Sequence, residues 1–483
     1  MSGPRELLVG IDVGTTMTKA AVVGLDGKEV SWGSVPTPWH PAPTGAEADP
    51  FEFLEAVGRA VAEALEAATP GPVVGVGVTS MAETVALLGK DGAPVSPSIV
   101  WHDPRGKAEA DDLVRTFGGP AFSARTGLPP SPLCTLVKLA WLSRHTDVPP
   151  VRALSVADWV VHALGGEQVS EASLACRLGA LSLAGRTWWH EGLEWAGVPT
   201  DIFAPIVQAG QLVGRVGGDG DGHGANAYLG ALARPGGQLG RLRGAAIAPA
   251  GHDHLCVAAG VGATAPGELL DSCGTAEGFV RTSLPLDGDK VGRAVSAGLS
   301  VGWHTVPDRY ALLGGQALGL LLGPVLGLLG IAGNEALLSF DRAAVGASPG
   351  ALRVQRDGPF GGASIVGLSP DASPAALWNA ALELVSEGAT RIMRVIEAES
   401  GPAEELVLTG GWAQCEGLRR RKELLLPRRR WPAVGEGGAR GAALFGGCAA
   451  GLFAGPESFP SPGDLAWASL PEPTGGARSR DSK

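Results

Sequence analysis

The sequence contains two copies of a pattern that could hold phosphate groups. Residues 11–16 read Ile-Asp-Val-Gly-Thr-Thr after an apolar run, and residues 269–275 read Leu-Leu-Asp-Ser-Cys-Gly-Thr. Each copy is a short apolar stretch, an acid and a Gly-Thr turn, followed by more apolar residues, which predicts a β-hairpin with a polar tip. Glycine lets backbone N–H groups approach phosphate oxygens, and the hydroxyls add donors. Two such turns facing each other could hold a triphosphate from both sides.

The acid of the first copy is Asp12. Mg²⁺ favours one or two carboxylates together with phosphate oxygens and water, so Asp12 is a candidate metal-side carboxylate. The ordinary alternative is a turn aspartate that bonds its own backbone in a hairpin that binds nothing. No GxxxxGK[ST] pattern occurs in the sequence, which excludes a P-loop enzyme. The candidate phosphate contacts are Gly14, Thr15, Thr16, Gly274 and Thr275.

Hydrophobic patterning predicts strands and helices that alternate in both halves of the chain. The first half is expected to contain a three-stranded meander over 7–36, a helix over 50–67 capped by Asp49, a buried strand over 73–79, a hairpin through 90–92, and helices over 105–117, 133–145 and 154–164. The second half is expected to contain a helix over 257–263, the second hairpin, strands near 297–303 and 310–315, a long helix, a loop over 346–374, a helix over 375–400, a strand over 406–409 and a helix over 437–454.

Both halves therefore repeat one arrangement, which predicts a duplicated α/β architecture with a cleft between the halves. Ligands of such folds bind at strand ends and domain interfaces. A chain of 483 residues exceeds the size at which a single core stops growing, so two domains are expected. The Gly/Arg-rich stretch 234–246 places the boundary, giving domains over 1–244 and 245–466 and a flexible tail over 467–483.

Composition and charge narrow the class of protein. The chain is 45% hydrophobic with a net charge of −11, which fits a globular protein and argues against a nucleic-acid binder. We interpret the basic residues at 419–422 and 428–430 as the solvent-exposed side of a surface helix and the segment that follows this helix. The six cysteines form no CxxC pair, so no zinc site is expected and a reducing compartment is indicated.

The sequence also bears on membranes and compartment. The uncharged stretch 311–333 is long enough to span a bilayer, but it is rich in glycine and contains Pro324, so a buried core helix is expected. The charged N-terminus leads straight into a strand, which is unlike a signal peptide. We therefore predict a cytoplasmic protein with a small-molecule substrate and no membrane or nucleic-acid partner, for which a homodimer is a candidate assembly.

Further short motifs follow one another in a defined order. They are Trp101-His102-Asp103-Pro104-Arg105, Lys138 to Leu142, Gly251-His252-Asp253, Gly367-Leu368 with Leu377 to Glu383, Gly410-Gly411, and Glu436 to Ala450. Together with the two Gly-Thr turns, their order and spacing resemble the FGGY carbohydrate kinase family, within the actin-like (ribonuclease H-like) ATPase superfamily. The resemblance covers residues 7 to about 455. The sequence departs from the family pattern at Leu133, Ala376 and Trp412.

The resemblance implies two duplicated actin-like domains, ATP and Mg²⁺ as cofactors, and a base at Asp253. A carboxylate can accept the proton of a hydroxyl as that hydroxyl attacks phosphorus. Without the resemblance, Asp253 is as readily a loop aspartate that caps the following helix. The resemblance also implies that Asp12 acts on Mg²⁺ through water. It assigns nucleotide contacts to Lys19 in the first phosphate loop and to Gly410, Gly411 and Gln414 in an adenosine loop.

The same resemblance implies an acceptor site at Trp101, Asp103 and Arg105. An indole face can cover the C–H surface of a sugar while an aspartate bonds hydroxyls. The alternative is a core tryptophan beside a surface ion pair.

Substrate contacts are also expected from Met81, Ala82, Glu83 and His254. Similar stretches carry Arg then Glu in glycerol kinases, where this chain has Ala82 then Glu83, whereas xylulokinases have His at the position of Glu83. His254 differs from the Gln or Asn common after the base. The chain matches neither pattern. We expect an ATP-dependent kinase acting on a ketopentose such as xylulose or a related sugar or polyol. The alternatives are a non-catalytic or chaperone-like actin-fold ATPase and a sugar sensor.

Overall fold

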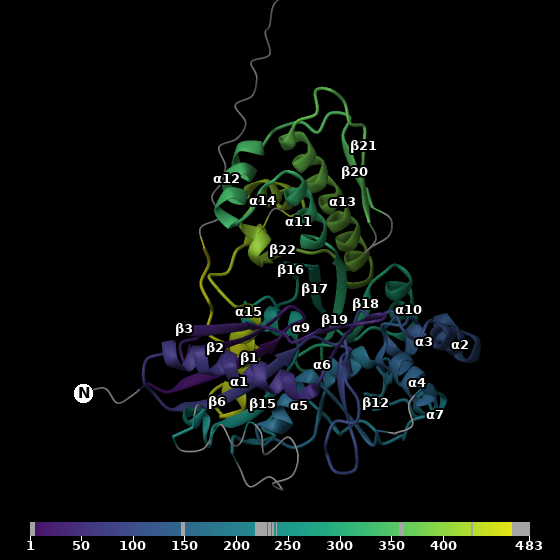
Figure 1. The fold of residues 1–483 in the computed structure, drawn as a ribbon, viewed down its shortest axis with the longest axis vertical. Helices are drawn as coiled ribbons and strands as arrows, with labels where there is room; N and C mark the ends of the chain where they lie inside the picture. The colour runs from purple at the N-terminus through teal and green to yellow at the C-terminus, as the bar shows by residue number, and fades with distance from the viewer. Residues whose placement is uncertain are drawn as a thin grey trace, which may run out of the picture.

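Two sheets form the centre of the fold. The computed structural model describes residues 5–145, 150–217, 239–356, 362–426 and 428–465, together with positions 229, 233, 236 and 237. Within these residues each of the two sheets has six strands. Figure 1 shows the first half of the chain, purple to blue, below the teal and green second half. The expected tail over 467–483 lies outside the described residues.

The first sheet brings three parallel strand ends together. Its order is β14-β15-β6-β1-β2-β3. The strands are β1 (Leu7–Val13), β2 (Met17–Gly24), β3 (Glu29–Pro36), β6 (Val73–Ser80), β14 (Gly214–Arg215) and β15 (Ala246–His252). β1 and β2 form the expected antiparallel hairpin, whereas β1, β6 and β15 run parallel, with Val13 opposite Ser80 and Ser80 opposite His252. The residues that follow these strands are therefore neighbours at one sheet edge.

The second sheet repeats this arrangement. Its order is β18-β19-β17-β16-β22-β23. The strands are β16 (Glu268–Cys273), β17 (Glu277–Ser283), β18 (Ser300–Trp303), β19 (Tyr310–Gln316), β22 (Glu405–Thr409) and β23 (Arg428–Arg430). β16 and β17 form the second Gly-Thr hairpin, and β22 lies parallel to β16 as β6 lies parallel to β1. This match confirms the predicted duplicated α/β architecture.

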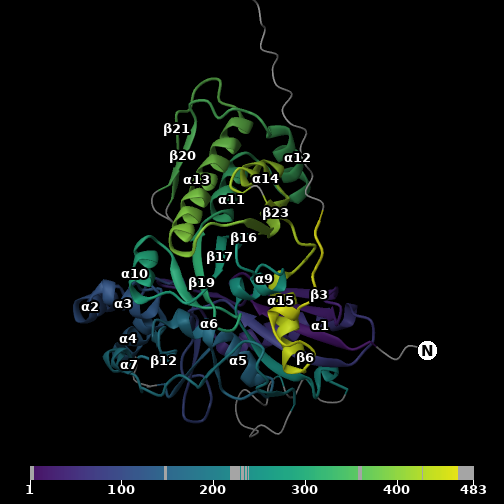
Figure 2. The same ribbon diagram turned by 180° about the vertical axis from the view of Figure 1, so that it is seen from behind.

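The last α-helix among the described residues returns to the first sheet. α15 (Gly437–Ala449) packs against β1, β6 and β15 and against α9 (Asp253–Gly260), and Figure 2 shows it from behind beside α9 and β6. This close approach requires small residues: a Cβ at Gly10 would lie 1.7 Å from the Ala439 carbonyl oxygen, and one at Gly77 would lie 1.8 Å from that of Ala442. The glycines of β1 and β6 thus set the distance between helix and sheet.

Other helices surround the two sheets. The helices predicted over 50–67, 105–117, 133–145, 154–164 and 375–400 are present, whereas the long helix expected after residue 315 is the ten-residue α11 (Gly319–Leu328). In the first half they are α1 (Pro50–Ala67), α2 (Lys107–Phe117), α3 (Gly119–Thr126), α4 (Thr135–His145), α5 (Val156–Ala163), α6 (Ala172–Ala175), η1 (Cys176–Leu178), α7 (His190–Ala196) and η2 (Gly240–Leu242). In the second half they are α10 (Gly288–Ser296), α11 (Gly319–Leu328), α12 (Asn334–Ala344), α13 (Pro374–Ser400), η3 (Gly411–Gln414), α14 (Glu416–Glu423) and η4 (Pro456–Ser458). The predicted cap of α1 is confirmed, since the Asp49 side chain accepts from the Phe51 backbone N–H at 2.9 Å.

Several elements differ from the prediction. The expected loop over 346–374 contains a hairpin of β20 (Arg353–Arg356) and β21 (Ala363–Val366). The expected hairpin through 90–92 keeps its turn, but β7 (Val85–Leu88) pairs with β9 (Arg152–Ser155), and β8 (Ser98–Ile99) pairs with β5 (Gly45–Ala48). No helix among the described residues is both long and apolar enough to cross a membrane. The domain boundary at 244 stays a prediction. Of the elements that follow it, β15 is a strand of the first sheet and α15 packs against that sheet.

Candidate active site

The proposed base lies where a strand meets a helix. Asp253 follows β15 and is the first residue of α9, so its carboxylate lies at a helix N-terminus. Its Oδ1 accepts the backbone N–H of His254 at 2.6 Å and lies 3.1 Å from Nε2 of His252. Burial alone raises the pKa of Asp253, but His254 and His252 outweigh it and hold this pKa at about 2. The carboxylate is therefore ionised at neutral pH.

Asp12 is the second carboxylate of the site. Burial and the nearby charge of Asp253 raise its pKa and Lys19 lowers it, and together they leave this pKa at about 7. Its buried Oδ1 has no hydrogen-bond partner among the described residues. A Cβ at Gly438 would lie 2.2 Å from Oδ2, so α15 closes over this carboxylate. An unpaired buried carboxylate oxygen beside another acid is a suitable environment for a divalent cation with oxygen ligands, and Asp12 fits a Mg²⁺ ligand.

Lys19 is paired with an acid that the sequence analysis did not select. Its Nζ lies 2.6 Å from Oε2 of Glu436, which is 417 residues away. The carboxylate of Glu29 accepts the backbone N–H groups of Gly435 and Glu436, each at 2.7 Å. Glu436 also raises the pKa of Asp12. The sequence places Glu436 only at the start of the closing helix, because nothing in the local sequence shows that α15 returns to β2.

The first Gly-Thr turn is joined to the expected acceptor motif. The Trp101 Nε1–H donates to the hydroxyl of Thr15 at 2.9 Å, and the Trp39 Nε1–H donates to the Thr15 carbonyl at 2.7 Å. The Gly14 N–H donates to the Met17 carbonyl at 3.1 Å and closes the turn, while Thr16 is exposed. The hydroxyl of Thr15 accepts from the indole and can still donate to a ligand.

The second Gly-Thr turn and the expected adenosine loop are in contact. Gly410 has φ 91°, and a Cβ there would lie 2.4 Å from the carbonyl oxygen of Cys273. The Thr275 carbonyl accepts the backbone N–H of Leu320 at 3.1 Å. Gly411 and Gln414 are exposed. These contacts bring the proposed phosphate and adenosine loops together at the end of β16.

The acid of the second copy differs in its surroundings from Asp12. Asp271 is fully buried, and the ammonium of Lys422 lies 2.6 Å from its Oδ2 and also contacts the carboxylate of Glu277. Burial and Glu277 raise the pKa of Asp271, to about 7, while Lys422 lowers it. The two copies have therefore diverged: Asp271 is held by an internal cation, whereas Asp12 keeps an oxygen available for a ligand.

Two of the expected acceptor residues are paired with each other. Both carboxylate oxygens of Asp103 accept from Arg105, Oδ1 from Nε at 2.9 Å and Oδ2 from Nη2 at 2.8 Å. Thr44 also donates to Asp103, and Arg105 reaches Glu47 at 2.5 Å. The hydrogen bonds of Arg105 outweigh burial and lower the pKa of Asp103. Direct contacts of this buried ion pair with an acceptor stay a prediction.

The remaining acceptor candidates gather beside Asp253. Met81 and Ala82 follow β6 and are buried in the core of the first sheet. The carboxylate of Glu83 is bound by Arg177, with Nη2 at 2.6 Å. The imidazole of His254 lies against β17, since a Cβ at Gly278 would lie 2.8 Å from it. Sequence analysis missed Arg177, because η1 contains no motif and is 94 residues from Glu83.

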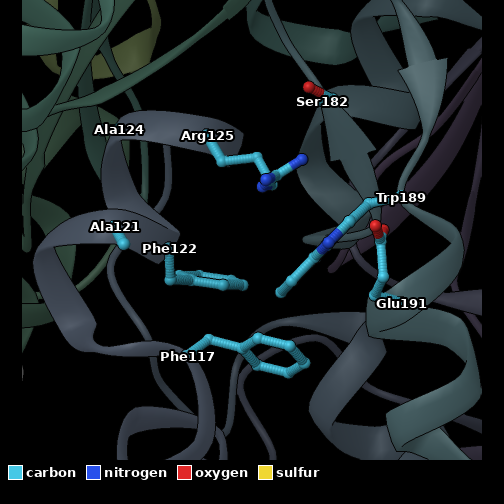
Figure 3. Close-up of a pocket in the computed structure, with 8 residues that line it drawn as sticks. All are labelled: Phe117, Ala121, Phe122, Ala124, Arg125, Ser182, Trp189 and Glu191. Atoms are coloured by element: carbon cyan, nitrogen blue, oxygen red, sulfur yellow. The ribbon is translucent and has the colours of Figure 1, made fainter.

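A separate cavity of about 540 Å³ opens on the first half of the molecule. Figure 3 shows Phe122 and Trp189 facing each other across it, with Arg125 above them and Phe117 below. The guanidinium of Arg125 lies 5.2 Å from the Trp189 ring centroid. None of the lining residues belongs to the candidate active site.

Comparison with solved structures gives the class of fold. Xylulose kinase from Rhodospirillum rubrum superimposes with a TM-score of 0.78 at 26% identity, covering 95% of this chain and 94% of that one. A structure described as a xyloylose kinase from Brucella ovis has a TM-score of 0.80 at 23% identity, with coverage of 95% and 94%. The fold is thus that of carbohydrate kinases with two actin-like domains.

Sequence comparison identifies similar proteins. Residues 7–221 match the model described as the N-terminal domain of the FGGY family of carbohydrate kinases. Xylulose kinase from Streptomyces coelicolor is 32% identical over 48% of this chain and 48% of its own length, so the chain spans about half of this relative. Glycerol kinase from Citrifermentans bemidjiense is 28% identical over 93% of this chain and 91% of its own length.

Proposed function

We propose that this protein is an ATP-dependent kinase that transfers the γ-phosphoryl group of ATP to a hydroxyl of a small sugar or polyol in the cytoplasm. A ketopentose such as xylulose is the first acceptor to test. The observation that carries the proposal is the pair of Asp253 and Asp12 at the same ends of two parallel strands, β15 and β1, which lie on either side of β6. One carboxylate is ionised and the other has an unpaired oxygen, which suits a base beside a metal.

Each residue of the proposed site has a separate role in the reaction. The acceptor hydroxyl loses its proton to the Asp253 carboxylate as its oxygen forms a bond to the γ-phosphorus, and the bond from that phosphorus to the β-phosphate oxygen breaks to release ADP. Mg²⁺ held by Asp12, directly or through water, would shield phosphate charge. Helix α9 keeps the carboxylate of Asp253 in place through the His254 backbone N–H.

The nucleotide contacts follow from the two turns and the adenosine loop. Gly14, Thr15 and Thr16 would bind phosphate from the first half, and Gly274 and Thr275 from the second. Lys19 would add a cation, and its ion pair with Glu436 keeps the ammonium near Asp12. Gly410, Gly411 and Gln414 would face the adenosine.

The alternative is an actin-fold ATPase or a sugar sensor without phosphoryl transfer. The hydrogen bond from Trp101 to Thr15 favours a kinase, because it joins the acceptor motif to the phosphate turn. The test is ADP release measured with xylulose, glycerol and gluconate, with mass detection of the phosphorylated acceptor. A phosphorylated product supports the proposal. ADP release without any phosphorylated acceptor would identify an ATPase, and tight acceptor binding without turnover would identify a sensor.

A further inference from the structure

Glu83 has an unusual backbone. Its φ is 62°, in the left-handed region that residues other than glycine seldom adopt. The hydroxyl of Thr135 donates to its carbonyl at 2.7 Å and helps to hold this conformation. Residues kept in such conformations by their surroundings are concentrated at binding and catalytic sites. The backbone therefore directs the Glu83 side chain, which is 11% exposed, to one defined place.

That place is occupied by the guanidinium of Arg177. Nε donates to Oε1 of Glu83 at 2.7 Å, and Nη2 lies 2.6 Å from the same oxygen. The cation that is absent at Ala82 is thus supplied by η1, from a distant part of the chain. Oε2 of Glu83 takes no part in these two contacts, and a guanidinium has more N–H groups than they use. The pair can therefore offer a hydroxyl both an acceptor and a donor.

Arg177 also reaches the second half of the molecule. Its Nη1 donates to the hydroxyl of Ser300 at 2.6 Å, and Ser300 is the first residue of the edge strand β18. The neighbouring Cys176 accepts the backbone N–H of Trp303 on its sulfur at 3.1 Å. One guanidinium therefore contacts the acceptor-side glutamate and the second sheet at once.

The pair lies close to the proposed base. Glu83 follows β6 and Asp253 follows β15, and the ends of these two strands are paired, with Ser80 opposite His252. Burial lowers the pKa of His254, Asp253 and Glu83 raise it, and Arg177 lowers it. His254 is the residue after Asp253 and packs against β17. An acceptor whose reacting hydroxyl is at Asp253 would place a neighbouring hydroxyl near the Glu83–Arg177 pair.

We propose that Arg177 is a specificity-determining residue that, with Glu83, binds two adjacent hydroxyls of a neutral acceptor and links that acceptor to the second half of the chain through Ser300. This inference rests on the proposed kinase function. One hydroxyl donates to Glu83 and its neighbour accepts from Arg177. A sugar acid fits less well, because its carboxylate would meet Glu83 and Asp253 in a partly buried site.

The test compares four variants with the wild-type protein. Arg177→Gln removes the positive charge. Arg177→Lys keeps the charge but loses the planar guanidinium, whose N–H groups can contact two partners at once. Glu83→Gln removes the other charge. Arg186→Gln is the matched control, since Arg186 lies 3.7 Å from the Trp303 ring at the same junction and, within the described part of the chain, contacts Trp303 and Asp308 rather than Glu83 or Ser300. Each is assayed with xylulose, glycerol and gluconate, with ATP varied separately and with ATP alone.

We expect the wild type to use xylulose or glycerol better than gluconate. Arg177→Gln and Glu83→Gln should each lower kcat/KM for the neutral acceptor by roughly 10- to 100-fold, with KM for ATP changed less than about twofold. Arg177→Lys should recover only part of this loss, and Arg186→Gln should match the wild type. Arg177→Gln should also release more ADP without acceptor, because the link to Ser300 is lost.

Three results would overturn the inference. The first is a kcat/KM for the neutral acceptor within twofold of wild type in both Arg177 variants. The second is an equal loss with ATP and acceptor, or an equal loss in Arg186→Gln, which would mark a structural role. The third is a preference for gluconate. In these cases the kinase proposal stands, whereas a wild type that phosphorylates none of the acceptors overturns both.

Discussion

The buried cluster around Lys422 allows a quantitative prediction about the second half of the molecule. The Lys422 side chain is 1% exposed, and its ammonium forms ion pairs with the carboxylates of Asp271 and Glu277. Lys422→Met keeps the length of the side chain and removes the charge. Removing one partner of a buried ion pair costs about 3–5 kcal/mol, because it leaves a buried charge without compensation. Two carboxylates lose their cation here, so we expect the upper part of this range.

The loss of unfolding free energy in Lys422→Met should depend on pH in a defined direction. The folded pKa of Asp271 is already raised from 3.8 to about 7 by burial and Glu277, and Lys422 is the group that lowers it. Without Lys422 the folded pKa rises further. A group with a raised folded pKa contributes stability below its unfolded pKa, and that contribution is lost as pH rises through the folded pKa. The unfolding free energy of Lys422→Met should therefore be closer to that of the wild type at pH 5 than at pH 8.

Denaturant unfolding at pH 5 and pH 8 measures both quantities. The triple variant Lys422→Met, Asp271→Asn, Glu277→Gln is the control, since it has no carboxylate in this cluster left to titrate and its unfolding free energy should lack this pH dependence. KM for ATP should rise in Lys422→Met, because Asp271 and Glu277 stand on the two strands that carry the Gly274-Thr275 turn. An unfolding free energy within about 1 kcal/mol of wild type at pH 8, or a loss equal at both pH values, would refute this reasoning.

The remaining predictions concern the reaction itself. Asp253→Asn should lower phosphorylation by ~10²–10⁴-fold while the unfolding temperature and ATP binding stay near those of the wild type, and a loss below about tenfold would place the base elsewhere. Glu83→Ala should lower kcat/KM for the acceptor by a factor that corresponds to ~1–3 kcal/mol with KM for ATP nearly unchanged, and a change in thermal stability alone would make Glu83 structural. The two halves should close on ligand and keep water from the γ-phosphate, so small-angle scattering should show compaction with acceptor and a non-hydrolysable nucleotide; an unchanged radius of gyration would count against closure.

The predictable part of the fold consists of features with a local signal. The Asp-Gly turn at residues 26–27 and alternating apolar residues predicted the β1–β2–β3 meander, and the Asp49 cap predicted α1. The hairpin of β20 and β21 was missed because Gly and Pro obscure strand periodicity in that stretch. The pairing of β8 with β5 could not be read from the sequence, because strand partners are chosen by packing between distant segments.

The sequence by itself determined the duplicated strand-acid-turn pattern, the residues that resemble the phosphate and acceptor motifs, and the helix that follows Asp253. Each of these depends on residues within a few positions of one another, where turn chemistry and hydrophobic period act directly. Only the tertiary structure decided which charges meet: Lys19 with Glu436, Glu83 with Arg177, and Asp271 with Lys422. These pairs join elements far apart in the chain, and the strength of each depends on burial that exists only once both sheets and α15 are packed.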